Sequence, residues 1–198
     1  MSVERLPDFA LDATQPLGGR FASLGIRAYR GAARHVHLLP YDRNSDRSDW
    51  RLVLSEGRGT CSTKHALLAE LARENGRRVA LVLGLYVMDE ANTPGVGAVL
   101  KPHGLRSVPE AHCYLAYEGA RVDLTRQVGG EGQIQHFLHE EEIEPYQIGE
   151  YKIEAHKRFV RRWAEERGLD PVHLWRVREE CIAALADESQ FDRRPSEG

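Results

Sequence analysis

Cys61 directly follows Gly59 and Thr60 and precedes an apolar pattern with helical spacing. The N–H groups and the dipole at a helix start stabilise negative charge, so a cysteine there is placed to form the nucleophilic thiolate. A thiolate that attacks a carbonyl also needs a histidine as base and a third group that orients the histidine. Taken alone, a free cysteine is more often a small buried core residue, so the rest of the chain must decide between the two interpretations.

A later stretch, "EAHCYLAYEGARVDLTR", provides a base and an orienting group. Two alternating runs flank Glu118 and Gly119, a pattern that predicts a β-hairpin with a two-residue turn. With this turn, His112 and Asp123 lie diagonally on one face of the hairpin. Diagonal side chains are about 7–8 Å apart at Cβ, close enough for an imidazole and a carboxylate to meet. The hairpin therefore predicts a His–Asp pair, which a loop of odd length would break.

The ordered set of motifs resembles the transglutaminase-like superfamily, a papain-like group of Cys-His-Asp enzymes. In that superfamily, Gly-x-Cys opens a helix, a later strand begins with His and has an aromatic residue two positions on, and the next strand carries Asp-x-Thr. The corresponding motifs here are Gly59-Thr60-Cys61, His112-Cys113-Tyr114 and Asp123-Leu124-Thr125. The resemblance covers residues 57–126, about a third of the chain. Tyr114 stands where the superfamily usually has tryptophan, and the C-terminal helical part matches nothing in it, which leaves the substrate open.

The resemblance implies a mechanism. His112 takes the thiol proton, Asp123 orients the imidazole, and Cys61 attacks an amide, ester or thioester carbonyl to give an acyl-enzyme. Water or an amine then resolves the intermediate, with hydrolysis favoured over cross-linking. The implied partner is a small-molecule or peptide acyl substrate, and no cofactor is expected.

Oxyanion stabilisation requires hydrogen-bond donors aimed at the developing charge. The backbone N–H of Cys61 is one expected donor. The second donor is open among Asn44, Trp50 and Tyr41, which precede the cysteine and carry donors. Tyr114, two residues after the histidine, is a further candidate for contact with the oxyanion or substrate.

Two other functions share this set of residues. The stretch "GRGTC" is similar to the Arg-Gly-Gly-x-Cys of arylamine N-acetyltransferases, although the chain is short for that family and shows no coenzyme A signature. A non-catalytic binding module on the same fold is the second alternative, and an intact triad argues against it.

A zinc site is another interpretation of the same residues. Cys61 and His65 lie four residues apart on one helix face, and His112 would be a third ligand. However, the chain has no Cys-x-x-Cys or His-x-x-x-His pair, so we predict no metal. His65 is then expected to support the site or to lie at the surface. Four other histidines are interpreted as solvated or singly buried, on one strand face (His35, His37) and on one helix face (His136, His139).

The two remaining cysteines are predicted to be core residues. Cys113 points away from His112 because neighbouring strand residues alternate, and Cys181 falls in the apolar pattern of the last helix. Three cysteines without a dense framework favour a reducing compartment. We therefore expect a cytoplasmic protein.

Composition excludes several classes of function. The chain has 198 residues, 41% of them hydrophobic, and a net charge of −3, which predicts no nucleic-acid or membrane partner. No signal peptide is visible, and the longest apolar stretch, residues 79–88, is too short to span a bilayer. The basic run at 156–163 is interleaved with glutamates and indicates a solvated helix face. The oligomeric state is not indicated.

The predicted fold is α+β, with the Cys61 helix packed on a small, mainly antiparallel sheet and extra helices at both ends. We expect one domain, 1–198, made of an arm (1–19), a catalytic core (20–126), a connector with helices (127–188) and a tail (189–198). Further expected elements are a helix at 21–33, an extended piece and polar loop at 35–49, a strand or helix at 50–55, a buried strand at 79–88, a long loop forming a flap before the hairpin, an acidic connector, and helices at 150–167 and 170–187.

Overall fold

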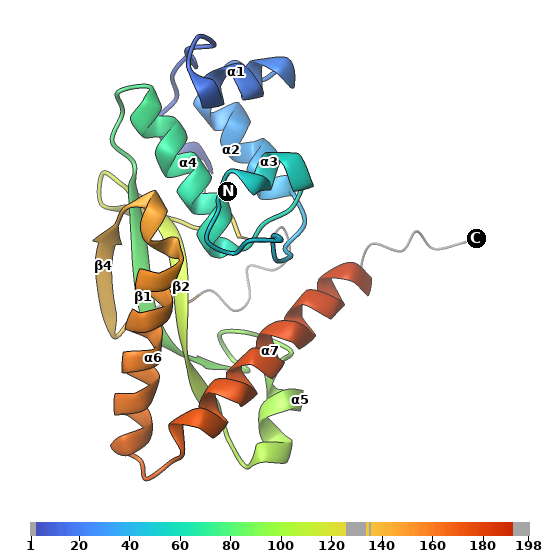
Figure 1. Cartoon of the computed structure of the whole chain (residues 1–198), viewed down its shortest axis with the longest axis vertical. Coiled ribbons are helices and arrows are strands. Elements are labelled where there is room, and N and C mark those ends of the chain that lie inside the picture. Colours follow the sequence, from blue (N-terminus) through green and yellow to red (C-terminus); the bar gives the residue numbers. More distant parts are fainter. Residues whose placement is uncertain (1–2, 126–133, 135, 192–198) are drawn as a thin grey trace, which may run out of the picture. The chain divides into compact units, whose positions relative to one another are not determined.

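The computed structural model describes residues 3–125, 134 and 136–191. The described part is mixed α+β, with seven α-helices and a four-stranded antiparallel sheet of order β3-β2-β1-β4 (Figure 1). The predicted α+β class is therefore confirmed, whereas the finer transglutaminase-like arrangement stays a prediction. None of the helices in the described ranges is long and apolar enough to cross a membrane.

The chain divides into two compact units. Unit 1 comprises Met1–Leu83, His112–Gln127 and Glu141–Tyr151, and unit 2 comprises Gly84–Ala111, Val128–Glu140 and Lys152–Gly198. Strands β1, β2 and β4 contribute residues to both units, so the division does not by itself make two domains. The single-domain expectation stays a prediction, and the units are described separately below.

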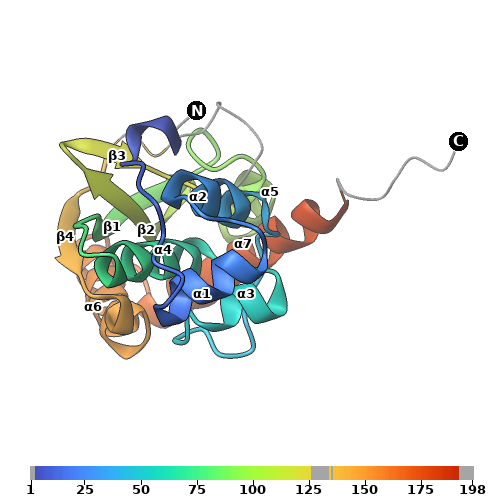
Figure 2. The same ribbon diagram turned by 90° about the horizontal axis from the view of Figure 1, so that it is seen from above.

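Unit 1 is built around one central helix. Its helices are α1 (Pro16–Ser23), α2 (Tyr29–Leu38), α3 (Leu52–Glu56) and α4 (Cys61–Glu74). The first three all contact α4, and Figure 2 shows α1 and α2 beside it. Eleven of the fourteen residues of α4 are buried, which places this helix inside the unit rather than on its surface. The helix ends at Glu74, with Asn75 as its C-cap, and Gly76 follows with a left-handed φ of +66°.

The N-terminal predictions were partly wrong. The helix expected at 21–33 is two helices, because α1 ends at Ser23 and Gly25 adopts a left-handed φ of +76° before α2 begins. The expected arm, residues 1–19, contains the 3₁₀-helix Val3–Arg5 and the start of α1. The extended piece expected after residue 35 is the last turn of α2, so His35 and His37 lie on a helix. The ambiguous segment 50–55 contains most of α3.

Two strands of the sheet form the predicted hairpin. The strands of the sheet are β1 (Ala80–Asp89), β2 (Ser107–Tyr117), β3 (Ala120–Val122) and β4 (His139–Ile143). β2 and β3 are antiparallel, with Tyr117 paired to Ala120, as a two-residue turn requires. Glu118 and Gly119 have φ values of +47° and +77°, the left-handed pair typical of a type I′ turn. The buried strand predicted at 79–88 is β1, confirmed within one residue at each end.

Unit 2 contains structure where loops were predicted. The expected flap includes helix α5 (Val96–Leu100) and the 3₁₀-helix Lys101–His103. Val96 and Leu100, four residues apart, are both buried, and α5 packs against α7 (Pro171–Phe191). In unit 1, the acidic connector includes the 3₁₀-helix Pro145–Ile148 and most of β4, whose first two residues belong to unit 2. The two predicted C-terminal helices are confirmed as α6 (Glu150–Glu165) and α7.

Candidate active site

Cys61 is the first residue of α4, as predicted. Side chains of the same unit stabilise the start of this helix. The Thr63 hydroxyl accepts a hydrogen bond from the Thr60 N–H at 3.0 Å and donates one to Asn44 Oδ1 at 2.9 Å. A Cβ on Gly59 would lie 2.9 Å from Thr63 Oγ1, so this position needs glycine for the chain's own close packing. Cys61 is buried, with 7% of its surface exposed.

The hairpin brings His112 and Asp123 together. His112 lies on β2, Asp123 directly follows β3, and His112 Nε2 is 2.7 Å from Asp123 Oδ2. The other carboxylate oxygen, Oδ1, accepts hydrogen bonds from the Thr125 N–H at 2.9 Å and from the Thr125 hydroxyl. The Asp-x-Thr motif thus orients its own carboxylate, which in turn orients the imidazole.

The Cys61 thiol lies close enough to the same histidine to raise the pKa of His112 through its charge and through side-chain hydrogen bonding. Because Asp123 occupies Nε2, the ring nitrogen left for the thiol is Nδ1. All three predicted triad residues belong to unit 1, and the structure connects them in the order Cys61, His112, Asp123. An activated cysteine requires a base of this kind and a third group that orients the base.

Electrostatics favour the charged forms of this pair. Burial alone would lower the pKa of His112, but the charges of Asp123 and Cys61 and the hydrogen bonds to both raise that pKa well above its ordinary value. Burial alone would also raise the pKa of Asp123, but His112 and the hydrogen bonds from His112 and Thr125 hold it well below its usual range. The side chain of Asp123 is 44% exposed, so solvent screens part of this attraction.

His65 is a site residue that the sequence left undecided between a supporting and a surface position. It is fully buried, with Nδ1 2.8 Å from the Cys61 carbonyl oxygen and Nε2 accepting the Leu124 N–H at 2.8 Å. Its Nε2 lies 3.7 Å from Asp123 Oδ1. The available signal was the i, i+4 spacing, which places His65 on the same helix face as Cys61.

Lys64 is a residue near the site that the sequence pattern did not indicate. Its side chain is fully buried, and Nζ donates to the carbonyl oxygens of Leu39 at 2.6 Å and Thr125 at 3.1 Å. A buried ammonium is tolerated where hydrogen bonds replace its hydration. Lys64 therefore ties α4 to the segment that follows Asp123.

Three of the four residues expected near the oxyanion or substrate, Asn44, Trp50 and Tyr114, have different surroundings. Asn44 is buried, and its amide group donates to Glu56 Oε2 at 3.1 Å and to the Arg58 carbonyl oxygen at 3.0 Å. Both amide hydrogens are thus engaged in holding the loop before Cys61. Trp50 and Tyr114 are buried beneath the guanidinium groups of neighbouring arginines, Arg51 and Arg121 respectively. Their proposed roles toward a substrate stay predictions.

The other cysteines and histidines take structural positions. Cys113 and Cys181 are fully buried, which confirms their assignment to the core. His37 lies on α2 with Nδ1 3.2 Å from the Leu124 carbonyl oxygen, and His139 begins β4, so the helix face expected for His136 and His139 was wrong. Within residues 3–125, 134 and 136–191, no group of three or more His, Cys, Asp or Glu side chains is arranged to hold a metal ion.

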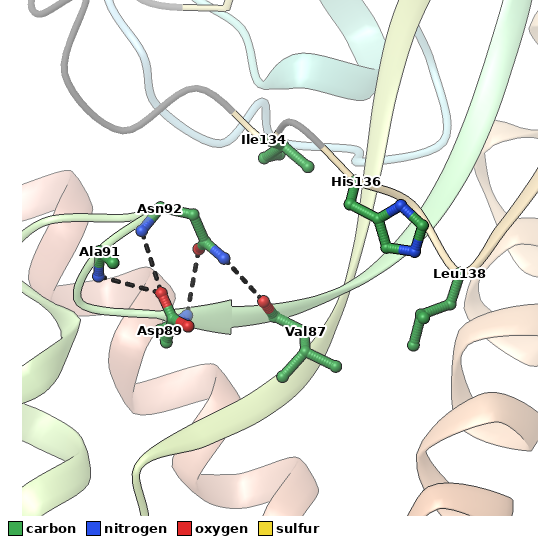
Figure 3. Close-up of a pocket in the computed structure, with 7 residues that line it drawn as sticks. All are labelled: Val87, Asp89, Ala91, Asn92, Ile134, His136 and Leu138. Atoms are coloured by element: carbon green, nitrogen blue, oxygen red, sulfur yellow. Dashed lines mark hydrogen bonds between the residues drawn. The ribbon is translucent and has the colours of Figure 1, made fainter.

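Unit 2 contains a cavity of about 380 Å³ near the end of β1 (Figure 3). Its polar side chains are largely engaged with their own turn. Asp89 Oδ1 accepts the N–H groups of Ala91 and Asn92 at 2.9 and 3.0 Å, and the Asn92 amide donates to the Val87 carbonyl oxygen at 2.8 Å. Ile134, His136 and Leu138 complete the lining, which includes no triad residue.

Models of known protein families, curated proteins and solved structures yield no match to this chain. The transglutaminase-like resemblance therefore depends on the motifs themselves and on the geometry that they form.

Proposed function

We propose that this protein is a cysteine enzyme of the transglutaminase-like kind, acting on an amide, ester or thioester through an acyl-enzyme. The observation that carries the proposal is the His112–Asp123 pair, together with a cysteine close enough to His112 to raise the pKa of that histidine. The central contact is the 2.7 Å hydrogen bond between His112 and Asp123, and the nucleophile stands at the first residue of a buried helix. Hydrolysis is favoured as the outcome.

The first half-reaction forms the acyl-enzyme. The Cys61 thiolate attacks the carbonyl carbon, a C–S bond forms, and the carbonyl electron pair moves onto oxygen. The backbone N–H of Cys61 is the proposed oxyanion donor. When the intermediate collapses, the bond to the leaving group breaks, and His112 gives that group its proton.

The second half-reaction restores the enzyme. Neutral His112 removes a proton from water while the water oxygen attacks the acyl carbon. The C–S bond then breaks, the carboxylic acid leaves, and the proton remains on His112 beside the regenerated thiolate. Asp123 supports the positive imidazolium and keeps Nδ1 directed at the sulfur.

Intact-protein mass spectrometry tests the proposal. The protein is incubated with p-nitrophenyl esters, peptide amides and acyl-coenzyme A thioesters, and the expected result is an acyl adduct on Cys61 that Cys61→Ala abolishes. Cys181→Ala is the matched control, because burial raises the pKa of Cys181 to about 11 and keeps that thiol protonated. Decay of the adduct in water supports hydrolysis, whereas transfer of an acetyl group from coenzyme A to an arylamine supports the N-acetyltransferase-like alternative.

Alkylation by iodoacetamide tests the nucleophile without a substrate. Cys61 is expected to react faster than Cys113 and Cys181 at mildly acidic pH. Equal and slow reaction of all three thiols would show that Cys61 is not activated and would favour the non-catalytic binding module.

A further inference from the structure

The buried imidazole of His65 is fixed in one tautomer by its two hydrogen bonds. The Leu124 N–H can only donate, so Nε2 of His65 accepts and carries no proton. Nδ1 must then carry the proton and donate it to the Cys61 carbonyl oxygen. Both ring nitrogens are therefore used, and neither bond is possible in the other neutral tautomer.

These two bonds join the backbones on either side of the triad. One partner is the carbonyl of the nucleophile itself, and the other is the amide of the residue that follows Asp123. A single rigid ring therefore spans from the start of α4 to the segment that carries the orienting carboxylate. The His65 and His112 rings lie edge to face, with centroids 6.5 Å apart.

We propose that His65 is a positioning residue of the triad, which holds Cys61 and Asp123 at a fixed separation and, by staying neutral, leaves the charge of Asp123 to His112. This inference rests on the proposed function of the site. It goes beyond that function, because it assigns a role to a residue that neither attacks the substrate nor transfers a proton.

The groups that face His65 explain why it stays neutral. Burial lowers the pKa of His65 to about 4, and although Asp123 opposes this, the positive charges of His112 and Lys64 lower the pKa further. A protonated His65 would lose its acceptor for the Leu124 N–H. Its new cation would also lie 3.7 Å from Asp123 Oδ1 and compete with His112 for that carboxylate.

Two substitutions test the two hydrogen bonds of His65 separately. His65→Asn places an amide near the position of Nδ1 and can still donate to the Cys61 carbonyl, whereas His65→Gln places an amide near Nε2 and can still accept from Leu124. The measurement is the rate of Cys61 alkylation by iodoacetamide as a function of pH. We expect each variant to react about tenfold more slowly than the native protein near pH 6, with the acid limb of its profile about one pH unit higher.

The matched control is His156→Gln in unit 2. His156 is similarly buried, and burial likewise lowers its pKa to about 4, but its contacts are to Pro109, Glu110 and Trp175. This control is expected to lower stability and to leave the alkylation profile of Cys61 unchanged. A purely structural role for His65 would make the His65 and His156 variants alike in both measurements.

The tautomer can also be tested without any substitution, which covers the case of variants that fail to fold. Nitrogen-15 NMR of the native protein is expected to show His65 protonated on Nδ1 alone between about pH 5 and pH 8. A proton on Nε2, or titration near pH 6.5, would overturn the inference, and so would His65 variants with native alkylation profiles. If Cys61 of the native protein reacts no faster than Cys181, the proposed function fails instead, whatever His65 does.

Discussion

Each unit of this protein places a histidine beside a buried or half-buried carboxylate. In unit 1, His112 Nε2 is 2.7 Å from Asp123 Oδ2, and in unit 2, His156 Nδ1 is 4.0 Å from Glu110 Oε1. The second carboxylate has a further partner, because Arg178 forms a two-pronged ion pair with Glu110 that includes a 2.7 Å bond from Nη2 to Oε1.

The pKa values of the two histidines consequently move in opposite directions. The pKa of His112 is raised well above its ordinary value, with Asp123 and Cys61 overcoming burial. Burial lowers the pKa of His156 to about 4. Glu110 attracts a proton to this imidazole and opposes the effect of burial, but the positive charge of Arg178 offsets part of that attraction. Whether a buried histidine is protonated therefore depends on its distance from the carboxylate and on the charge that the carboxylate retains beside its other partners.

The largest expected effect is on reactivity in unit 1. His112→Ala removes the base and the positive partner of the thiolate, so we expect Cys61 to alkylate at least about 100-fold more slowly at mildly acidic pH. His156→Ala is the comparison variant and is expected to leave the rate within about twofold of the native value, since the contacts of His156 involve no triad residue. Equal losses in the two variants would mean that the distinction between the histidines is wrong.

The next largest effect tests whether Arg178 makes the difference. Arg178→Met leaves Glu110, whose side chain is 5% exposed, without its main cation, and we expect a loss of about 3–5 kcal/mol in the free energy of unfolding by urea. The pKa of His156 is expected to rise, because the carboxylate then attracts a proton to the imidazole. Arg176→Met is the control, since the Arg176–Glu180 pair is largely exposed and contributes at most about 1 kcal/mol. An unchanged pKa of His156 in Arg178→Met would contradict our explanation.

The His112–Asp123 pair of unit 1 was predictable because its geometry is local. Alternation along a strand and the turn at Glu118-Gly119 fix which residues share a face, and the observed pairing of Tyr117 with Ala120 follows from that turn. The start of α4 was predictable for a similar reason, since its capping residues and leucine spacing lie within one segment.

The arrangement of His156, Glu110 and Arg178 in unit 2 was not predictable because it depends on tertiary packing. Glu110 and Arg178 are far apart in sequence, and no local pattern indicates that they meet. Helix α5 was missed for the same reason, since one turn gives almost no periodic signal and this short helix packs against α7, which is distant in sequence. His65 was visible by spacing, but whether it bound a metal or the backbone depended on contacts that sequence does not show.

A third prediction compares how the histidines affect stability as pH changes. His112 has a raised pKa in the folded state, so its stabilisation is complete below about pH 6.5 and is lost as pH rises through the folded pKa. The pKa of His156 is about 4 in the folded protein, so folded His156 stays neutral where the unfolded chain binds a proton. The free energy of unfolding therefore falls as pH drops from about 6.5 toward 4, by up to about 1.4 kcal/mol per pH unit. Urea unfolding across this range should show that His156→Gln reduces the slope on the acid side, to which His65 also contributes with a pKa of about 4, and that His112→Gln flattens the alkaline side. The reverse assignment of slopes would contradict the charge states given above.

The smallest expected effect concerns the turn that sets the unit 1 pair. Glu118 has a φ of +47°, which asparagine tolerates better than glutamate, so Glu118→Asn is expected to raise the free energy of unfolding by about 0.5–1 kcal/mol. Glu118→Gln is the matched control, because it removes the charge but keeps an unbranched side chain in the same conformation, and it should bring no such gain. Neither variant is expected to change the alkylation rate of Cys61, because the turn fixes the register of β2 and β3 whether or not Glu118 is strained. A faster or slower reaction in Glu118→Asn alone would show instead that backbone strain at the turn reaches the His112–Asp123 bond, and that the unit 1 pair is set by more than strand register.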